Sequence, residues 1–327
     1  MEKRIRNSKI LVTGGAGFIG SNLVESLLKA NNSVVCLDNF STGKRENIKV
    51  FMGNPLFKLI EGDIRNIEDC RIAVKDIDIV FHEAALGSVP RSIKDPVTTV
   101  DVNIGGYVKM LHSAVEAGVK RFIYAASSST YGDHVGLPKV EDKIGNPLSP
   151  YAVTKYSDEQ FAAVFSIHYP IEVIGLRYFN VFGRKQDPDG AYAAVIPKFV
   201  MQLLKHERPL INGDGTVSRD FTYIDNVIQA NHLSALADNK TAVNQVYNVA
   251  CGKSTSINEM YTVIRDFLGK YDPTILSIDP AYGPDRFGDI KHSLASIEKA
   301  EKLLGYSPEV EVKAGLEETV NWLRKNL

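Results

Sequence analysis

The fold is decided by residues 9–20, which have the sequence Lys9-Ile10-Leu11-Val12-Thr13-Gly14-Gly15-Ala16-Gly17-Phe18-Ile19-Gly20. The five residues before the glycines are typical of a buried strand, and the spacing of apolar residues after Gly17 predicts a helix. Gly14 allows a tight turn, Gly17 lets the backbone approach a pyrophosphate at the positive helix end, and Gly20 allows close packing of helix on strand. The segment therefore predicts a dinucleotide-binding strand, turn and helix.

The next apolar run indicates which dinucleotide is bound. Residues 34–37 are strand-like and end at Asp38, eighteen residues after Gly20. A carboxylate at this position accepts hydrogen bonds from the adenosine ribose hydroxyls and repels the additional phosphate of NADP. Asp38 therefore favours NAD as the cofactor. The alternative is that Asp38 only begins a turn before Asn39, which its position after the strand disfavours.

Further strand-like runs lie at residues 57–61, 78–82, 122–126 and 172–177, separated by helical patterns. This alternation predicts an α/β fold with a doubly wound parallel sheet of the Rossmann type and a ligand crevice at the carboxyl ends of its strands. After residue 180 the alternation weakens. We expect an NAD-binding domain over residues 1–180 and a smaller α/β substrate-binding domain over 181–327, with a strand near 246–250 returning to the large sheet.

The composition is that of an ordinary globular protein. With 327 residues, 44% of them hydrophobic, the chain can bury a large core, and its net charge of −1 offers no basic surface for nucleic acid or an anionic membrane. No apolar stretch is long enough to span a membrane. Cys36, Cys70 and Cys251 are far apart, so neither a disulfide framework nor a metal site is expected. We therefore expect a cytoplasmic protein that binds small molecules.

Tyr151 and Lys155 are the strongest catalytic candidates. Pro150 opens a predicted helix, on which residues four apart share a face, so the Lys155 ammonium lies near the Tyr151 ring and favours its phenolate. Such a tyrosine can take a proton from a sugar hydroxyl and return it. The alternative is a chance pair on a solvated helix, and the glycine motif upstream favours the catalytic interpretation.

A run of hydroxyl side chains follows the strand at 122–126, beginning with Ser127, Ser128 and Ser129. A hydroxyl at this strand end can bridge a sugar oxygen and the Tyr151 phenol. The alternative is a serine run that caps a turn by bonding its own backbone. That alternative competes more strongly for Ser128 than for Ser127.

These motifs, in this order, resemble the extended short-chain dehydrogenase/reductase family and, within it, the nucleotide-sugar 4-epimerases, above all those acting on UDP-N-acetylglucosamine. The resemblance covers nearly the whole chain. It rests on the glycine motif, Asp38, Asp63, His82-Glu83-Ala84-Ala85, the serines before Tyr131-Gly132, Tyr151 with Lys155, residues 177–183, residues 213–225 with Arg219, and Arg286-Phe287-Gly288-Asp289. It implies tightly bound NAD, a UDP-sugar substrate and a homodimer.

The resemblance assigns roles to individual residues. Counted back from Tyr131-Gly132, the family's catalytic Ser/Thr is Ser127; Tyr151 is the acid/base, and Lys155 binds the nicotinamide ribose. His82 is interpreted as a structural residue behind the cofactor. The residues expected to contact NAD are Gly14, Gly17, Phe18, Ile19, Gly20, Asp38, Asn39, Asp63, Ile64, Ala84, Ala85, Asn103, Tyr151, Lys155 and Tyr178.

A second set of residues is expected to bind the UDP-sugar. Arg219 and Arg286 would hold its diphosphate, because guanidinium forks suit phosphate oxygens, although either arginine alone is also compatible with a surface salt bridge. No metal is expected to take part. The full set is Gly87, Ser88, Ser128, Ser129, Asn180, Gln186, Ala194, Val195, Arg219, Arg286, Asp289 and Ser293.

The resemblance also indicates the reaction. Sugar dehydratases of this family carry acidic residues beside the catalytic Ser/Thr, where this chain has Ser128 and Ser129, so a base for elimination is missing. Reversible oxidation at C4 remains. Tyr151 would take the C4 hydroxyl proton while a hydride passes to NAD, and return of both to the opposite face of the rotated 4-ketose would invert C4.

Ser293 indicates the sugar. In the 4-epimerases this position is often bulky where the sugar carries only hydroxyls and small where an N-acetyl group must fit, so we expect UDP-N-acetylglucosamine and UDP-N-acetylgalactosamine. UDP-glucose/UDP-galactose and a UDP-uronic acid are alternatives. Another interpretation of Ser293 is a cap for the helix after it. An alternative of another class is a non-enzymatic NAD-binding regulator, although such proteins commonly lose the Tyr/Lys pair that this chain keeps.

The homodimer is expected to form through helices at about 100–117 and 151–168. Their apolar residues exceed what one sheet-facing stripe requires. These residues include Val102, Val108, Leu111, Val153, Phe161 and Val164.

Overall fold

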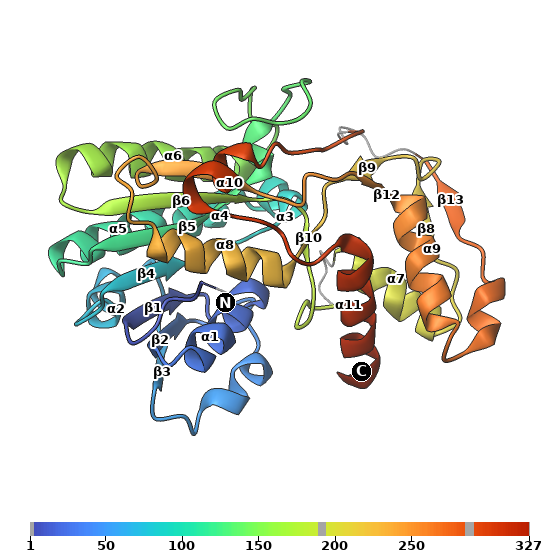
Figure 1. Ribbon diagram of the computed structural model, residues 1–327, viewed down its shortest axis with the longest axis horizontal. Helices are drawn as coiled ribbons and strands as arrows, with labels where there is room; N and C mark the ends of the chain where they lie inside the picture. Colours follow the sequence, from blue (N-terminus) through green and yellow to red (C-terminus); the bar gives the residue numbers. More distant parts are fainter. Residues whose placement is uncertain (1–2, 189–193, 285–290, 327) are drawn as a thin grey trace.

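The centre of the protein is a seven-stranded parallel sheet in the order β11-β6-β5-β4-β1-β2-β3 (Figure 1). The computed structural model describes residues 3–188, 194–284 and 291–326. The strands are β1 (Lys9–Thr13), β2 (Ser33–Asp38), β3 (Phe57–Glu61), β4 (Ile79–His82), β5 (Arg121–Ser127), β6 (Glu172–Tyr178) and β11 (Gln245–Val249). The predicted doubly wound Rossmann sheet is confirmed, and β11 is the predicted returning strand, paired in parallel with β6.

Helices cover both faces of this sheet because successive side chains of each strand point to opposite sides. Ile10 and Val12 pack in one core cluster, whereas Leu11 between them packs in another. α1 and α8 pack together on the first side, and α2, α5 and α6 on the second. The bounds of these helices are α1 (Phe18–Lys29), α8 (Ile224–Leu236), α2 (Ile67–Ala73), α5 (Tyr107–Glu116) and α6 (Pro150–His168).

The helical segment predicted at about 100–117 is not one regular α-helix. It follows α3 (Val89–Lys94) and α4 (Pro96–Val100), continues as the π-helical turn η3 (Asp101–Gly106), and becomes α5. At the end of η3 the backbone of Gly106 packs closely against Ile64. A larger residue would not fit, since a Cβ there would lie 2.6 Å from the Ile64 side chain.

One residue predicted for the dimer interface lies elsewhere. Leu111 is fully buried in the core cluster beneath α5, because this helix packs against both α2 and α6, so its assignment to an interface was wrong. Val102 and Val108 are partly buried against the same cluster. The remaining predicted residues, all on α6, are exposed: Val153, Phe161 and Val164.

A smaller region lies beside the sheet, at the right of Figure 1. Its helices are α7 (Val195–Leu204), α9 (Ile257–Leu268) and α11 (Val312–Asn326). Its strands form three pairs, β7 (Val181–Phe182) with β10 (Thr222–Tyr223), β9 (Ser218–Arg219) with β12 (Thr255–Ser256), and β8 (Leu210–Asn212) with β13 (Ala281–Gly283). The chain therefore leaves the sheet after β6 and returns to it through α8 and β11.

The other described elements connect these layers. Among them, α10 (Glu298–Leu304) packs against β11 at the edge of the sheet. These elements are η1 (Arg45–Asn47), η2 (Lys49–Phe51), η4 (Ser128–Tyr131), η5 (Pro273–Ser277) and α10 (Glu298–Leu304). Within the described residues, no helix has both the length and the apolar character needed to cross a bilayer.

Candidate active site

The glycine loop between β1 and α1 has no room for larger side chains. Gly14 adopts a left-handed φ of +66°, and a Cβ there would lie 2.8 Å from the backbone nitrogen of Ala84. A Cβ on Gly20 would lie 2.2 Å from the carbonyl oxygen of Gly14. The loop thus holds the positive N-terminus of α1 open toward the crevice, where it can receive a pyrophosphate.

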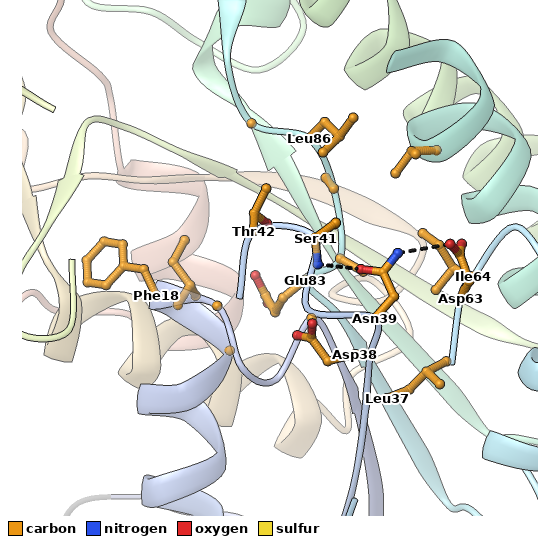
Figure 2. A pocket seen from close by; sticks show the side chains of 18 of the residues that line it. Phe18, Leu37, Asp38, Asn39, Ser41, Thr42, Asp63, Ile64, Glu83 and Leu86 are labelled. Atoms are coloured by element: carbon orange, nitrogen blue, oxygen red, sulfur yellow. Dashed lines mark hydrogen bonds between the residues drawn. The ribbon is translucent and has the colours of Figure 1, made fainter. Parts of the chain in front are cut away.

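A pocket of about 330 Å³ opens at this loop (Figure 2). It collects most of the residues predicted to contact NAD, namely Gly14, Gly17, Phe18, Ile19, Gly20, Asp38, Asn39, Asp63, Ile64, Ala84 and Ala85. Gly87, predicted to bind substrate, also lines it. Sequence reasoning missed Leu37, Ser41, Thr42, Gly62, Glu83, Leu86 and Val102. Most of these residues come just after the end of a strand, so their positions in the sequence could have predicted that they line the pocket.

Carboxylates organise the end of the pocket that is predicted to bind adenosine. Asp38 is buried and accepts hydrogen bonds from the backbone N–H groups of Ala16, at 2.9 Å, and Phe40, at 2.8 Å, while burial raises its pKa. Asn39 donates to Asp63 at 2.9 Å (Figure 2), and the Arg65 guanidinium holds the pKa of Asp63 at about 2. Asp38 therefore fixes the loop at the position where the adenosine ribose is predicted to bind.

Lys155 is on α6 and, like Tyr151, is not among the residues that line this pocket. Its side chain is only 3% exposed, and Nζ donates to the Ala125 carbonyl at 3.0 Å and to Asp158 at 3.2 Å. Burial alone would lower the pKa of Lys155, but the charges of Asp158 and Tyr151 raise it on balance. The structure thus brings Lys155 and Tyr151 within electrostatic reach on α6, whose first turn is capped by Ser149 and opened by Pro150.

Two residues predicted to contact NAD stand behind the pocket wall. Asn103 accepts from the Leu86 N–H at 2.8 Å and donates to Thr154 Oγ1 at 3.0 Å, so it ties the wall to α6. The Tyr178 hydroxyl donates to Glu83 at 2.9 Å. Neither residue lines the pocket itself. Asn103 positions Leu86 of the wall and the neighbouring helix α6, and Tyr178 positions Glu83 of the wall.

Ser127 ends β5 and caps the short helix η4. Its Oγ accepts from the Ser129 N–H at 3.2 Å and from the Ser129 hydroxyl at 2.9 Å. Ser127, rather than Ser128, therefore caps this turn. The capping bonds use the lone pairs of Ser127 and leave its proton available for donation, so this role and the catalytic one are compatible.

A second pocket, of about 260 Å³, lies in the smaller region and brings together Asn180, Val195 and Arg219. Asn180 has a left-handed φ of +37° and donates to the Asp220 carbonyl at 2.9 Å. Arg219 donates to the Ser218 carbonyl at 3.0 Å. The wall is completed by residues that the sequence did not reveal, namely Phe199, Leu210, Ile211, Asn212, Val217, Phe221 and Ile257.

The remaining predicted substrate residues are more dispersed. A Cβ on Gly87 would meet no atom within 4 Å, and Ser88 caps α3. Gln186 donates to the Val181 carbonyl at 3.3 Å, and Ala194 is the exposed N-cap of α7. Arg286 and Asp289 lie outside the described residues.

Ser293 lies beside the second pocket through its backbone. Its N–H donates to the Ser218 carbonyl at 3.1 Å, next to Arg219. The alternative role of Ser293 as a helix cap was wrong, because α10 begins at Glu298 with Ile297 as its N-cap.

His82 is buried behind the NAD pocket, 3.0 Å from the Thr13 hydroxyl and stacked on Phe122. Burial and the charge of Lys155 lower its pKa to about 3, so it is neutral, as expected of a structural residue. Cys36, Cys70 and Cys251 are free thiols. In the part of the chain that the structure describes, no group of His, Cys, Asp and Glu is arranged to hold a metal.

Known proteins match the chain along nearly its whole length. A curated relative from Methanocaldococcus jannaschii, named a putative UDP-glucose 4-epimerase, is 38% identical over 97% of this chain and 99% of that protein. A solved UDP-N-acetylglucosamine 4-epimerase from Methanobrevibacter ruminantium, in complex with UDP-N-acetylmuramic acid, is 39% identical with a TM-score of 0.90 over 99% of this chain and 100% of the other. A UDP-glucuronic acid 4-epimerase from Bacillus cereus, solved with UDP-glucuronic acid and NAD, is 35% identical with a TM-score of 0.87 over 98% and 100%.

The cofactor follows from the site and from the family. The crowded glycine turn and the buried Asp38 carboxylate fit NAD, and residues 10–250 match a family described as NAD dependent. The chain is thus an NAD-dependent enzyme and belongs to the NAD dependent epimerase/dehydratase family.

Proposed function

We propose that this NAD-dependent UDP-sugar 4-epimerase interconverts UDP-N-acetylglucosamine and UDP-N-acetylgalactosamine through a 4-keto intermediate. The observation that carries the choice of sugar is the small side chain of Ser293, whose backbone is bonded to Ser218 beside Arg219. A bulky residue at this position would occupy more of the space near Arg219, which is proposed to hold the diphosphate of the substrate. The solved UDP-N-acetylglucosamine 4-epimerase, at 39% identity, supports the same choice.

The chain's own residues supply the acid–base chemistry. Tyr151 takes the proton of the C4 hydroxyl and later returns a proton to the C4 oxygen, while Ser127 holds that oxygen in place. Lys155, fixed by Ala125 and Asp158, keeps a positive charge beside Tyr151. Bound NAD supplies the acceptor and donor of the C4 hydride. No atom is gained or lost, so the product differs from the substrate only in the C4 configuration.

The anchoring residues explain how the opposite face of the ketose is reached. Arg219 and Arg286 hold the diphosphate, and Asn180, Ala194 and Val195 line the path of the nucleotide sugar. The sugar then rotates about its phosphate bonds without leaving the protein. Gly87, Ser88, Ser128, Ser129, Gln186, Asp289 and Ser293 complete the proposed binding set.

UDP-glucose/UDP-galactose and UDP-glucuronic acid are the competing substrates, because relatives named for each match the chain. Purified protein would be incubated with each UDP-sugar, and the epimers resolved by proton NMR. We expect the acetylated pair to interconvert with the highest kcat/KM. Faster conversion of a non-acetylated sugar would overturn the substrate choice, and conversion of none would favour the non-enzymatic NAD-binding regulator.

The protein is also proposed to be a homodimer built on α6. Val153, Phe161 and Val164 are exposed on this helix, together with Ile167, which is 76% exposed. An apolar face of this kind on a long helix is typically covered by a partner. Light scattering at micromolar concentration should give twice the monomer mass, and a monomer would contradict the proposal.

A further inference from the structure

Glu83 is the least explained side chain of the NAD pocket. It follows β4 and lines the pocket in Figure 2. Its Oε1 accepts a hydrogen bond from the Tyr178 hydroxyl at 2.9 Å, and Asn231 donates to that hydroxyl at 2.9 Å. Among the described residues none bonds its Oε2, although this atom is shielded from solvent. One carboxyl oxygen is therefore fixed by the fold, and the other has no protein partner there.

The strand order shows which part of NAD lies near Glu83. Along the edge of the sheet, Asp38 ends β2, the glycine loop follows β1, Glu83 follows β4, and Ala125 of β5 holds Lys155. Asp38 is the predicted contact of the adenosine ribose, and Lys155 is the predicted contact of the nicotinamide ribose. Glu83 lies between the pyrophosphate site and Lys155, and Lys155 and Glu83 favour each other's charge. Glu83 therefore belongs to the nicotinamide half of the cleft.

We propose that Glu83 is a residue that tunes the cofactor, its carboxylate favouring the oxidised over the reduced nicotinamide. The oxidised ring carries a positive charge that the reduced ring lacks, and a negative charge in a poorly solvated cleft stabilises the charged ring selectively. Lys155 has the opposite effect. The opposite charges of Glu83 and Lys155 would then offset each other, so that neither the oxidised nor the reduced cofactor accumulates during the reaction. This inference rests on the bound NAD and not on the identity of the sugar.

The charge of Glu83 depends on pH in the neutral range. Burial raises its pKa to about 7, although the Tyr178 hydrogen bond and the charge of Lys155 act in the opposite direction. Glu83 is thus mostly neutral at pH 6 and ionised at pH 9, so its influence on NAD should appear as the pH rises through 7.

The neighbouring titratable groups are Tyr178 on β6, Lys155 and Tyr151 on α6, and His82 on β4. His82 stays neutral and Lys155 charged, and burial raises the pKa of Tyr178. Asp158, bonded to Lys155, also has a pKa raised to about 7 by burial. The wild-type protein must therefore be compared with a Glu83 variant at each pH.

The test measures the dissociation constants of NAD⁺ and NADH for protein freed of cofactor, at pH 6 and pH 9. Glu83→Gln keeps the shape and removes the charge. At pH 9 its ratio of Kd for NAD⁺ to Kd for NADH should be about tenfold higher than in the wild type, or about 30 mV in the potential of a two-electron couple. At pH 6 the two proteins should differ by less than about twofold.

Asp38→Asn is the matched control, because it neutralises a carboxyl group at the adenosine end of the same cleft. It should weaken both cofactor forms alike and leave their ratio unchanged. Glu83→Met, a second neutral variant, should reproduce the ratio of Glu83→Gln even if the amide disturbs Tyr178. An unchanged ratio at pH 9, or equal weakening of both forms by the Glu83 variants, overturns the proposal. Since no sugar is present, this result is independent of the NMR assay of epimerisation.

Discussion

The cofactor pocket and the substrate pocket differ in how their walls are made. The first takes its residues from the ends of neighbouring strands in one parallel sheet, so β1, β2 and β4 bring their loops to a single edge. The second joins α7 to short strand pairs whose partners are far apart in the chain, such as β9 with β12 and β8 with β13. Sequence motifs predict a pocket of the first kind more completely, because the sheet itself dictates convergence.

The largest effect should come from Tyr151→Phe, a change on α6 outside the walls of both pockets. The change removes the transferable proton and preserves the ring. We expect turnover to fall on the order of 10²-fold or more, with unchanged dissociation constants for NAD and UDP. Steady-state kinetics and calorimetric binding measure these quantities. Near-normal turnover would assign the acid/base role to another residue.

Gly20→Ala should impair the cofactor pocket and leave the substrate pocket unchanged. The new Cβ would lie 2.2 Å from the Gly14 carbonyl oxygen, so the loop must shift, and overpacking of this kind costs about 1–3 kcal/mol. Thermal unfolding and NAD titration should both record the loss. Gly53→Ala is the matched control, since its Cβ would meet nothing within 4 Å. Equal behaviour of the two variants would show that the loop is not tightly packed.

Ser293→Tyr should change substrate binding and leave the cofactor pocket unchanged. If the small side chain leaves room for the N-acetyl group, the tyrosine should lower kcat/KM for the acetylated pair about tenfold to a hundredfold, through about 1–3 kcal/mol of overpacking. UDP-glucose and UDP-galactose should be spared. The ratio of the two kcat/KM values separates this effect from general damage. A ratio equal to that of the wild type would remove the size argument.

Ser127→Ala should have a smaller effect than Tyr151→Phe, because it removes an orienting hydroxyl and not the proton carrier. One hydrogen bond of this kind contributes about 0.5–1.5 kcal/mol, so turnover should fall by about tenfold or less. The lost cap of η4 should also appear as a modest fall in Tm. If turnover falls further than in Tyr151→Phe, the two roles are reversed.

Lys44→Ala should have the smallest effect, although it breaks an ion pair between the loop after β2 and the segment after β7. Lys44, in the loop after β2, pairs at 2.7 Å with Asp187, in the segment after β7, but the side chains are 45% and 39% exposed. Pairs this exposed contribute about 1 kcal/mol or less. NAD affinity should therefore change less than about fivefold. A larger loss would mean that the two loops hold each other over the cofactor.

The same contrast explains what could be predicted from the sequence. Asp38, Asp63 and Ala84 could be placed because each lies at the end of a strand of the sheet or just after one. Nothing in the sequence indicated that Glu83 would bond Tyr178, 95 positions away. The bond of the Ser293 backbone to Ser218 joins segments far apart in the chain, so the sequence pattern did not indicate it. Leu111 was misplaced because α5 packs on two sides, which makes a buried helix look like an interface.

The pairing of β11 with β6 has a consequence for the order in which the protein folds. The sheet that forms the cofactor pocket is complete only when residues 245–249 have emerged from the ribosome, long after β6. Until then β6 is an open edge, able to pair with another nascent chain. A fragment ending at residue 180 would expose this edge permanently and should aggregate. The chain between β6 and β11, which supplies α7 and strands β7 to β10 of the smaller region, must therefore be synthesised before the sheet can close.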